Sequence, residues 1–293
     1  LGAAAVIYQI RHPPRKTFAV ALAHGDPTEP SELGYASQSV TFTLPDGTTT
    51  PGWIIDGRSH DGPTVIIVHG YGDSRYGALS WLPLVAPHAQ RVVLFDLPGQ
   101  GESQAKASGG GLREPADVLA VLDQIDAPQG AVLFGYSMGA GIAIAAAAQA
   151  GQRIVGVIAD GPYRDWDEPL RSHFRARRYP IFPILPLAGL ILRWVARGFD
   201  RFDRAAYAAQ VRGPLLVLHG SEDELCPIES ARAIALTAPR GRLVEFPGGH
   251  HLDLASIDAP RYRAALEAFF REIRQPSAST TTRNTPTQEA ASG

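Results

Sequence analysis

The chain has 293 residues, 45% of them hydrophobic and 19% charged, with a formal net charge of −2. This length and composition suit one sizeable hydrophobic core, and the balanced charge excludes a basic field for nucleic acid and the acidic composition typical of disorder. The single cysteine, Cys226, excludes an intrachain disulfide and a metal site built from several thiolates.

Residues 1–38 are interpreted as an N-terminal arm that precedes the first strand. Its first ten residues, Leu1–Ile10, are mostly apolar, and a basic stretch follows them. A bilayer span needs about 20 apolar residues, so this stretch is either the remnant of a longer anchor or signal segment or an arm packed loosely on the surface. The first alternative predicts membrane contact through the N-terminus, and the localisation stays open between cytoplasmic and membrane-associated.

Residues 39–162 and 213–275 are predicted to form an α/β core. Two segments flank the turn at Asp46–Gly47 and are expected to pair as an antiparallel hairpin: Val40–Leu44 and Trp53–Ile55. Six further runs are rich in Val, Ile and Leu and apolar on both faces, as the strands of a buried parallel sheet are. They are Val65–Val68, Val92–Phe95, Ala131–Phe134, Ile154–Ala159, Leu215–Leu218 and Leu243–Phe246.

Helical patterns separate these strands. They cover roughly Tyr76–Val85, Glu114–Ile125, Met138–Ala150, Ile228–Leu236 and Tyr262–Ile273. Repeated strand–helix–strand units predict a mostly parallel, eight-stranded sheet with helices on both faces. Ligands of such folds bind beyond the carboxyl ends of the strands, so we look for functional residues there.

Residues 163–212 interrupt this rhythm, because the segment between two strands is here far longer than a simple crossover. We interpret them as an inserted helical lid. Within it, Tyr179–Val195 is very apolar but contains three prolines and an arginine, which argues against a transmembrane span. An apolar lid favours substrates with apolar groups, and the alternative is a patch that docks on lipid or pairs two subunits. Residues 276–293 are polar and are predicted to form a disordered tail.

The strongest functional signal is Phe134–Gly141, where an apolar strand runs into Gly-Tyr-Ser-Met-Gly and an Ala/Gly-rich helix follows. A nucleophilic serine stands on a sharp turn between strand and helix, and glycines two residues to either side prevent clashes with that turn. The helix N-terminus adds positive partial charge and N–H groups. The pattern predicts that Ser137 is a nucleophile, against the alternative of a glycine-rich turn with an incidental serine.

With these residues in place, the chain resembles the α/β-hydrolase superfamily over about residues 40–273. Four further segments agree in order and position with that family's motifs for the oxyanion loop, a glycine-rich loop, the acid and the histidine. They are His69–Gly72, Phe95–Ser103, His219–Asp223 and Pro247–His250. The resemblance implies the α/β-hydrolase fold with catalytic residues in the chain order Ser, Asp, His, but it says much less about the substrate.

A serine nucleophile needs a base that removes its proton and a carboxylate that orients the base. His250 and His251 compete for the role of base. We prefer His250, because it directly follows two flexible glycines and matches the family's motif, and we treat His251 as a neighbour that lines the site. For the carboxylate, Asp223 matches the family's position, and Asp160 is the reserve candidate.

Three other polar residues at strand ends are interpreted as structural. His69 and His219 each end a strand before a glycine, where a ring nitrogen can satisfy backbone groups of the loop. Asp96 is expected to accept hydrogen bonds from the turn Gly99–Ser103.

The tetrahedral intermediate of acyl transfer needs N–H donors for its oxyanion. Met138 directly follows the serine and is expected to supply one donor from its backbone. The resemblance assigns the second donor to the backbone N–H of Tyr71, whose side chain then remains available for another role, such as packing on the lid.

These residues predict a serine hydrolase that cleaves small-molecule carboxylic esters through an acyl-serine intermediate, with no metal and no organic cofactor. A peptidase, thioesterase, acyltransferase or haloperoxidase-like enzyme would use the same triad. A dehalogenase or epoxide hydrolase of this fold has aspartate where this chain has Ser137. A non-catalytic binding protein on the same scaffold is the alternative of a different class. The oligomeric state stays open.

Overall fold

The structure is a computed structural model that describes residues 2–195 and 202–274. Its centre is one eight-stranded sheet with the order β1-β2-β4-β3-β5-β6-β7-β8. The strands are β1 Ser37–Thr43, β2 Thr49–Asp56, β3 Thr64–Val68, β4 Arg91–Phe95, β5 Ala131–Tyr136, β6 Ile154–Asp160, β7 Leu215–Gly220 and β8 Gly241–Phe246. All eight predicted strands are therefore present in the fold.

The sheet is mostly parallel, as the sequence predicts. The hairpin β1–β2 is antiparallel, with Thr43 opposite Thr49, and β2 joins the sheet antiparallel to β4. The pairs from β4 through β8 are all parallel. Because parallel strands end at one edge of a sheet, the loops after β3, β5, β6, β7 and β8 meet there.

Alternate side chains of the central strands enter two separate cores, one on each face of the sheet. Ile66 and Val68 belong to the core covered by α5, α6 and α10, whereas Val65 and Ile67 belong to the core covered by α3, α4 and α12. This is the pattern expected of strands that are buried on both faces. The covering helices are α3 Arg75–Ala78, α4 Leu82–Val85, α5 Glu114–Asp123, α6 Met138–Ala150, α10 Ile228–Thr237 and α12 Ala259–Arg274, with the short α11 Leu254–Ile257 before α12.

The helix predicted over Tyr76–Val85 is broken into short pieces. A 3-10 turn, Leu79–Trp81, separates α3 from α4. Pro83 lies in the first turn of α4, where its missing N–H costs no hydrogen bond, but in a continuous helix it would remove one and clash with the preceding turn. Proline therefore forces a new helix start at this point.

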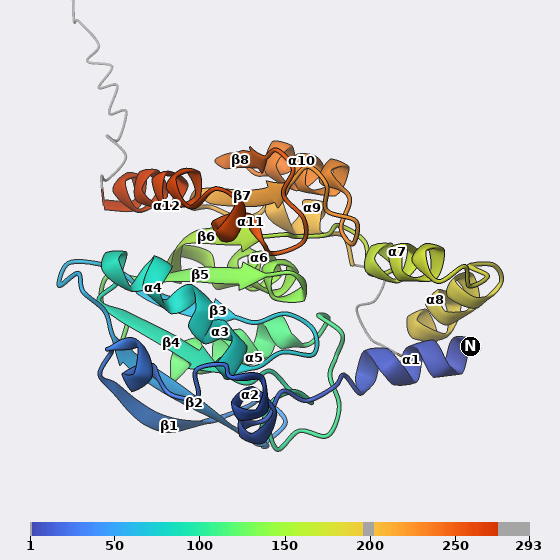
Figure 1. The fold of residues 1–293 in the computed structure, drawn as a ribbon, viewed down its shortest axis with the longest axis horizontal. Helices are drawn as coiled ribbons and strands as arrows, with labels where there is room; N and C mark the ends of the chain where they lie inside the picture. The colour runs from blue at the N-terminus through green and yellow to red at the C-terminus, as the bar shows by residue number, and fades with distance from the viewer. Residues whose placement is uncertain (1, 196–201, 275–293) are drawn as a thin grey trace, which may run out of the picture.

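The segment between β6 and β7 is what we call the insertion (residues 163–212). Its described residues, 163–195 and 202–212, form three helices: α7 Glu168–Ala176, α8 Ile184–Val195 and α9 Arg204–Ala208. The N-terminal segment forms α1 Ala3–Arg11 and α2 Phe18–His24, followed by a 3-10 turn at Pro30–Leu33. Figure 1 shows α7, α8 and α1 side by side at the right of the molecule, beyond the end of the sheet to which β5 and β7 point.

Helix α1 packs on the insertion, and this contact was not predicted. Ala3 and Val6 of α1 form a small buried cluster with Phe174 of α7 and with Leu185 and Ala188 of α8. Within residues 2–195 and 202–274, no helix combines the length and the apolar character that crossing a bilayer requires. The predicted tail, residues 276–293, lies outside the described residues.

Candidate active site

Ser137 stands on a strained turn between β5 and α6. Its backbone has φ 53° and ψ −122°, a conformation that residues other than glycine rarely adopt. The turn has room only for glycine nearby: a Cβ added at Gly135 would lie 2.2 Å from the Gly139 carbonyl oxygen, and one at Gly139 would lie 2.0 Å from the Val68 carbonyl oxygen. The predicted reason for both glycines is thus confirmed.

A histidine and a carboxylate line up behind the serine hydroxyl. His251 Nε2 lies 3.0 Å from Ser137 Oγ, and His251 Nδ1 lies 2.7 Å from Asp223 Oδ2. A carboxylate only accepts hydrogen bonds, so Nδ1 carries the proton and Nε2 offers its lone pair to the serine hydroxyl. The loops after β7 and β8 thereby bring Asp223 and His251 to the end of β5.

The histidine predicted from the sequence, His250, does not reach Ser137, and the structure places His251 there instead. The ring of His250 is exposed and reaches the carbonyl oxygen of Glu222 at 3.0 Å instead of Ser137. Two contacts fix the loop in this register: the backbone N–H of His250 donates to Asp253 Oδ1, and that of Glu222 donates to the carbonyl of Gly249. As a result the next residue, His251, enters the site.

The side chain of Asp223 is nearly inaccessible to solvent, and both of its carboxylate oxygens accept hydrogen bonds. The backbone N–H groups of Leu225 and Cys226 donate to its Oδ1 at 2.9 and 2.8 Å, while Oδ2 accepts from His251. Burial disfavours its charged form, but the hydrogen bond and charge of His251 and the backbone hydrogen bond from Cys226 outweigh burial and hold the pKa of Asp223 below its usual value. Asp223 is therefore ionised when it faces His251.

The reserve carboxylate, Asp160, points to a different partner. It is fully buried at the end of β6, and Tyr262 Oη donates to its Oδ2 at 2.7 Å. Burial raises the pKa of Asp160 to about 6, against the hydrogen bond from Tyr262. Its backbone carbonyl also accepts from the Ser137 N–H at 2.8 Å, so Asp160 supports the serine turn from behind.

The two predicted oxyanion donors belong to segments next to the serine. Met138 is the first residue of α6, and the loop His69–Gly72 approaches so closely that a Cβ on Gly70 would lie 3.3 Å from Ser137 Cβ. Neither the Tyr71 nor the Met138 backbone N–H donates a hydrogen bond to a residue that the structure describes. The Tyr71 hydroxyl donates to the carbonyl of Gln9 at 2.5 Å, so this side chain is tied to α1, a contact that the sequence did not suggest.

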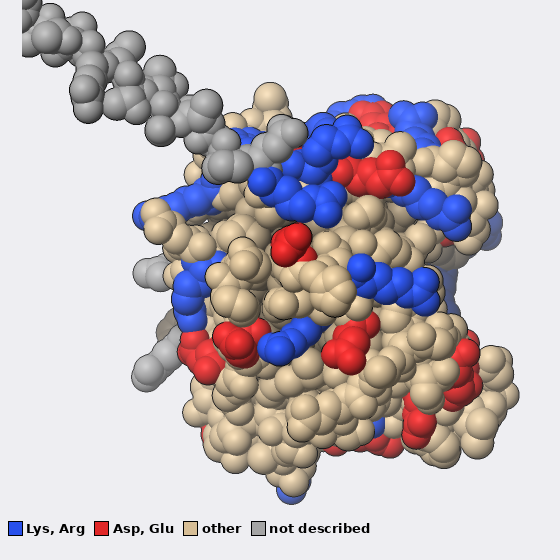
Figure 2. All heavy atoms as spheres, turned by 90° about the vertical axis from the view of Figure 1, so that its left-hand side faces the viewer, with Lys and Arg blue, Asp and Glu red and all other residues tan. Residues whose placement is uncertain are grey.

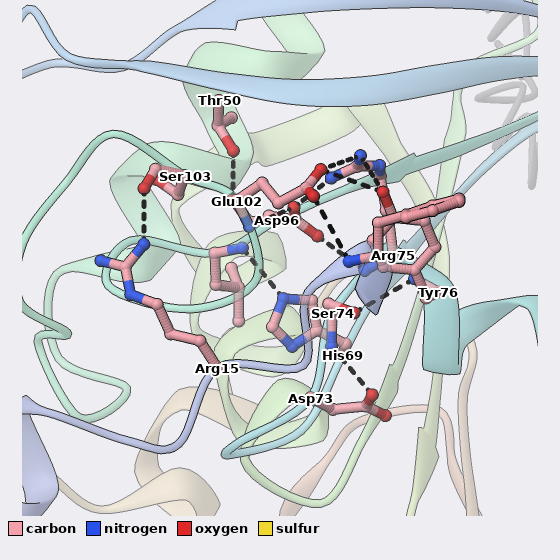
Figure 3. Close-up of polar contacts among 12 residues, drawn as sticks. Arg15, Thr50, His69, Asp73, Ser74, Arg75, Tyr76, Asp96, Glu102 and Ser103 are labelled. Atoms are coloured by element: carbon pink, nitrogen blue, oxygen red, sulfur yellow. Dashed lines mark hydrogen bonds and ion pairs between the residues drawn. The ribbon is translucent and has the colours of Figure 1, made fainter. Parts of the chain in front are cut away.

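The loop His69–Gly72 is followed by a buried ion-pair network (Figure 3). Asp96 accepts from the Arg75 backbone at 2.7 Å and from the Glu102 backbone at 2.8 Å, and it forms an ion pair with the Arg75 guanidinium. The Glu102 contact confirms the predicted role of Asp96 in the turn Gly99–Ser103. His69 Nε2 accepts from the Leu97 N–H at 2.9 Å, as predicted for a structural histidine.

His219 is also structural, as predicted. Its Nε2 lies 2.9 Å from the carbonyl oxygen of Cys226 and therefore donates to it. This contact, together with the two backbone donors on Asp223, shapes the loop that presents the carboxylate to His251.

The serine opens into a pocket of about 750 Å³. Ser137, Met138, His251 and Tyr71 line it on the side of the core, and α1 contributes residues 9–11. The insertion supplies a mostly apolar wall from residues of the predicted lid: Tyr163, Trp166, Leu170, Phe174, Leu192 and Phe202. His173 and Arg177 also line the pocket from the insertion, so that side is mostly apolar with two polar side chains, and the pocket is polar at the serine.

Among the described residues, one group has three ligand atoms close enough for a metal ion: Asp223, Cys226 and His251, within 4.8 Å of one another. Two of these three side chains already form the hydrogen bond that orients His251. Burial raises the pKa of the Cys226 thiol well above its usual value, which disfavours the thiolate that binds metal. The arrangement fits proton transfer better than metal binding.

The chain is similar to proteins of one fold family. A family model described as alpha/beta hydrolase fold matches residues 63–180. YfhR of Escherichia coli, which is described as an uncharacterized protein, is 29% identical over 233 residues, covering 76% of each chain.

Two solved structures have the same fold. An esterase of Pyrococcus furiosus superposes with a TM-score of 0.71 at 21% identity, covering 89% of this chain and 98% of that one. A membrane phospholipase A, described as a bacterial virulence factor, superposes with a TM-score of 0.63 at 19% identity, covering 94% and 96%. At these identities the two structures establish the fold alone.

Proposed function

We propose that this chain, which has the α/β-hydrolase fold and matches that fold's family model over residues 63–180, is a serine hydrolase that cleaves carboxylic esters through an acyl-serine intermediate. One observation carries the proposal: the hydrogen-bonded chain from Ser137 Oγ through His251 to Asp223, with distances of 3.0 and 2.7 Å. A nucleophile, a base and an orienting carboxylate at hydrogen-bond distances are what acyl transfer to serine requires.

In the first half of the reaction, Ser137 Oγ attacks the ester carbonyl while His251 Nε2 takes the hydroxyl proton. Asp223 holds the imidazole in the correct tautomer and stabilises its positive charge. The backbone N–H groups of Tyr71 and Met138 donate to the oxyanion of the tetrahedral intermediate. When that intermediate collapses, the ester C–O bond breaks, and the alcohol leaves with the proton from His251.

In the second half, water attacks the acyl-serine. His251 takes one proton from the water and returns it to Ser137 Oγ as the C–O bond to the serine breaks, which releases the carboxylic acid. Water is the proposed acceptor, so the reaction needs no group besides the residues named here.

The insertion acts in this proposal as a lid over an apolar binding pocket. Phe174 and Leu192 are buried and line the pocket opposite the serine, so an acyl or alkoxy group gains from leaving water there. We therefore expect the enzyme to prefer esters with apolar groups of medium length over acetates.

A series of p-nitrophenyl esters from acetate to palmitate tests the proposal, together with a fluorophosphonate probe. We expect turnover that rises from acetate to a medium-chain ester, and covalent labelling of Ser137 that the Ser137→Ala variant abolishes. Labelling at another residue, or no labelling of a folded protein, would contradict the serine mechanism. A clear preference for acetate would contradict only the apolar lid.

A further inference from the structure

The exposed apolar side chains of this protein are concentrated on the insertion and on α1. Six of the twelve exposed large hydrophobic side chains of the described residues lie there. They are Tyr8, Tyr179, Phe182, Leu187, Leu190 and Trp194. Trp194 is 85% exposed and Phe182 is 79% exposed, which is unusual for large apolar groups on one surface and marks an interaction site.

The helix α8 is apolar on two opposite sides. Leu185, Ala188 and Leu192 are buried, and the first two pack on α1 and α7. Leu187, Leu190 and Trp194 are spaced three and four residues apart, so they form a second stripe along the outer side of the helix. We call this stripe, with Phe182, the outer face of α8. Its side chains are between 47% and 85% exposed.

Positive charge lies next to the outer face. Arg175, Arg177 and Arg178 are exposed at the end of α7, where Arg177 also lines the rim of the serine pocket, and none of them forms an ion pair with a carboxylate of residues 2–195 or 202–274. Asp167, at the other end of α7, lines a hollow together with Leu190 of the outer face, but its charge is paired with Arg171 at 2.6 Å. The turn from α7 to α8 is the outermost part of the insertion in Figure 1.

The opposite side of the molecule has a different character. Figure 2 shows that face, on which Lys and Arg are intermingled with Asp and Glu. The insertion differs from that face, because its unpaired arginines lie beside a stripe of exposed aromatic and aliphatic side chains. Such a combination fits the interface of a bilayer, where apolar groups enter the acyl region and guanidinium groups bind lipid phosphates.

We propose that the outer face of α8, together with the three arginines at the end of α7, docks on the surface of a bilayer that contains anionic lipids. In this position Trp194 and Phe182 reach below the headgroups, and Arg175, Arg177 and Arg178 contact the phosphates. The opposite side of α8 lines the pocket through Leu192, so docking places the pocket within one helix diameter of the membrane. The inference does not depend on the chemistry of Ser137.

Sedimentation of the full chain with lipid vesicles tests this inference. We expect binding to vesicles of equal parts phosphatidylcholine and phosphatidylglycerol, weaker binding to pure phosphatidylcholine, and loss of that difference at high salt. The combined variant Phe182→Ser, Leu190→Ser, Trp194→Ser should bind about tenfold less or weaker still. Leu236→Ser is the matched control, because Leu236 is 88% exposed on α10, and it should bind like the wild type.

Tryptophan fluorescence gives a second readout that does not require a protein with several substitutions. The emission of the wild type should shift to shorter wavelength when the anionic vesicles are added, and Trp194→Phe should remove the shift while binding persists. The variant Arg175→Gln, Arg177→Gln, Arg178→Gln should lose the preference for anionic vesicles.

Three results would overturn the proposal. The wild type could fail to bind either vesicle, or the combined apolar variant could bind as well as Leu236→Ser. Alternatively, the wild type could be a dimer without lipid that the apolar variant converts to a monomer, which would assign the outer face to a second copy of the chain. Each result concerns binding alone, so it would leave the proposed ester hydrolysis untouched.

Discussion

His250 and His251 are neighbours in the chain, but their imidazole rings contact different partners. The ring of His251 lies between Ser137 and Asp223, whereas the ring of His250 is exposed and contacts the carbonyl of Glu222. Chain position alone therefore does not decide which imidazole can move the proton of the serine.

Replacing each histidine in turn with alanine tests which of them is the base. His251→Ala should lower kcat/KM for a p-nitrophenyl ester by on the order of 10⁶-fold, as far as Ser137→Ala does, because serine and base act as a unit. His250→Ala should keep kcat/KM within about tenfold of the wild type, since only its contact with a carbonyl is lost. If the two histidine variants exchanged these effects, the base in the reaction would be His250.

The two carboxylates near the site allow a similar comparison. Asp223→Asn should lower kcat by on the order of 10⁴-fold, because an amide at this place favours the wrong tautomer of His251. Asp160→Asn should leave most of the activity, since Asp160 faces Tyr262 and not the imidazole. Steady-state kinetics of both variants would measure this, and a greater loss in Asp160→Asn would show that the wrong acid has been assigned.

Much of the fold could be predicted because its signals are local. The strands β3 to β7 are short runs buried on both faces, and the helix α6 was predicted with the bounds it has in the structure, Met138–Ala150. The serine turn was predictable for the same reason, because Gly135 and Gly139 leave no room for a side chain. Local pattern and packing agree at these places.

What could not be predicted depends on contacts between distant segments. Helix α1 is stabilised by α8, which lies far along the chain, and ten apolar residues alone do not reveal that partner. The choice between the two histidines rests on hydrogen bonds of Asp253 and Glu222 that fix the loop's register. Two flexible glycines before the pair leave that register open at the level of sequence.

Gly139 provides a test of the packing behind the nucleophile. A Cβ at this position would lie 2.0 Å from the Val68 carbonyl oxygen and 2.6 Å from the His69 carbonyl oxygen, and backbone atoms of a central strand cannot easily move away. Gly139→Ala should therefore lower the free energy of unfolding by about 3 kcal/mol or more in urea denaturation.

Gly189→Ala is the control for this prediction, since Gly189 is also in a helix. Its added Cβ would meet only the ring of Trp166 at 3.1 Å, and a side chain can shift by that small amount. Alanine also favours the helix, so the free energy of unfolding should stay within about 1 kcal/mol of the wild type. Equal effects of both variants would contradict the role given to the close approach at Gly139.

Removing one partner of the buried ion pair between Asp96 and Arg75 should greatly lower the free energy of unfolding. The Asp96 side chain is inaccessible to solvent and that of Arg75 is 8% exposed, so Asp96→Ala leaves a guanidinium that is only partly compensated by Glu102. We expect a loss of about 3–5 kcal/mol in the free energy of unfolding. In contrast, Asp123→Ala breaks an ion pair whose side chains are 50% and 60% exposed, and it should cost less than about 1 kcal/mol.

Asp117 should make the stability of the protein depend on pH. It is buried in the first turn of α5 beside Glu114, and burial, followed by the charge of Glu114, raises the pKa of Asp117 to about 7 from its ordinary value of 3.8. The folded state thus binds this proton more tightly than the unfolded state. The contribution of Asp117 to stability is fully present below pH 3.8 and is lost as the pH rises through about 7.

Asp117→Asn removes the titratable carboxyl, and with it the free-energy cost of a buried charge at high pH. At pH 8 the variant should be more stable than the wild type by about 1–4 kcal/mol. The upper value is the full difference between the folded and unfolded pKa at about 1.36 kcal/mol per unit. The gain is smaller if the lost charge also stabilised the N-terminus of the helix. At pH 4 the advantage should vanish, because the wild-type carboxyl is then protonated in the folded state. Urea denaturation of both proteins from pH 4 to 8 measures the difference, and an advantage that is constant with pH would show that Asp117 does not titrate in this range.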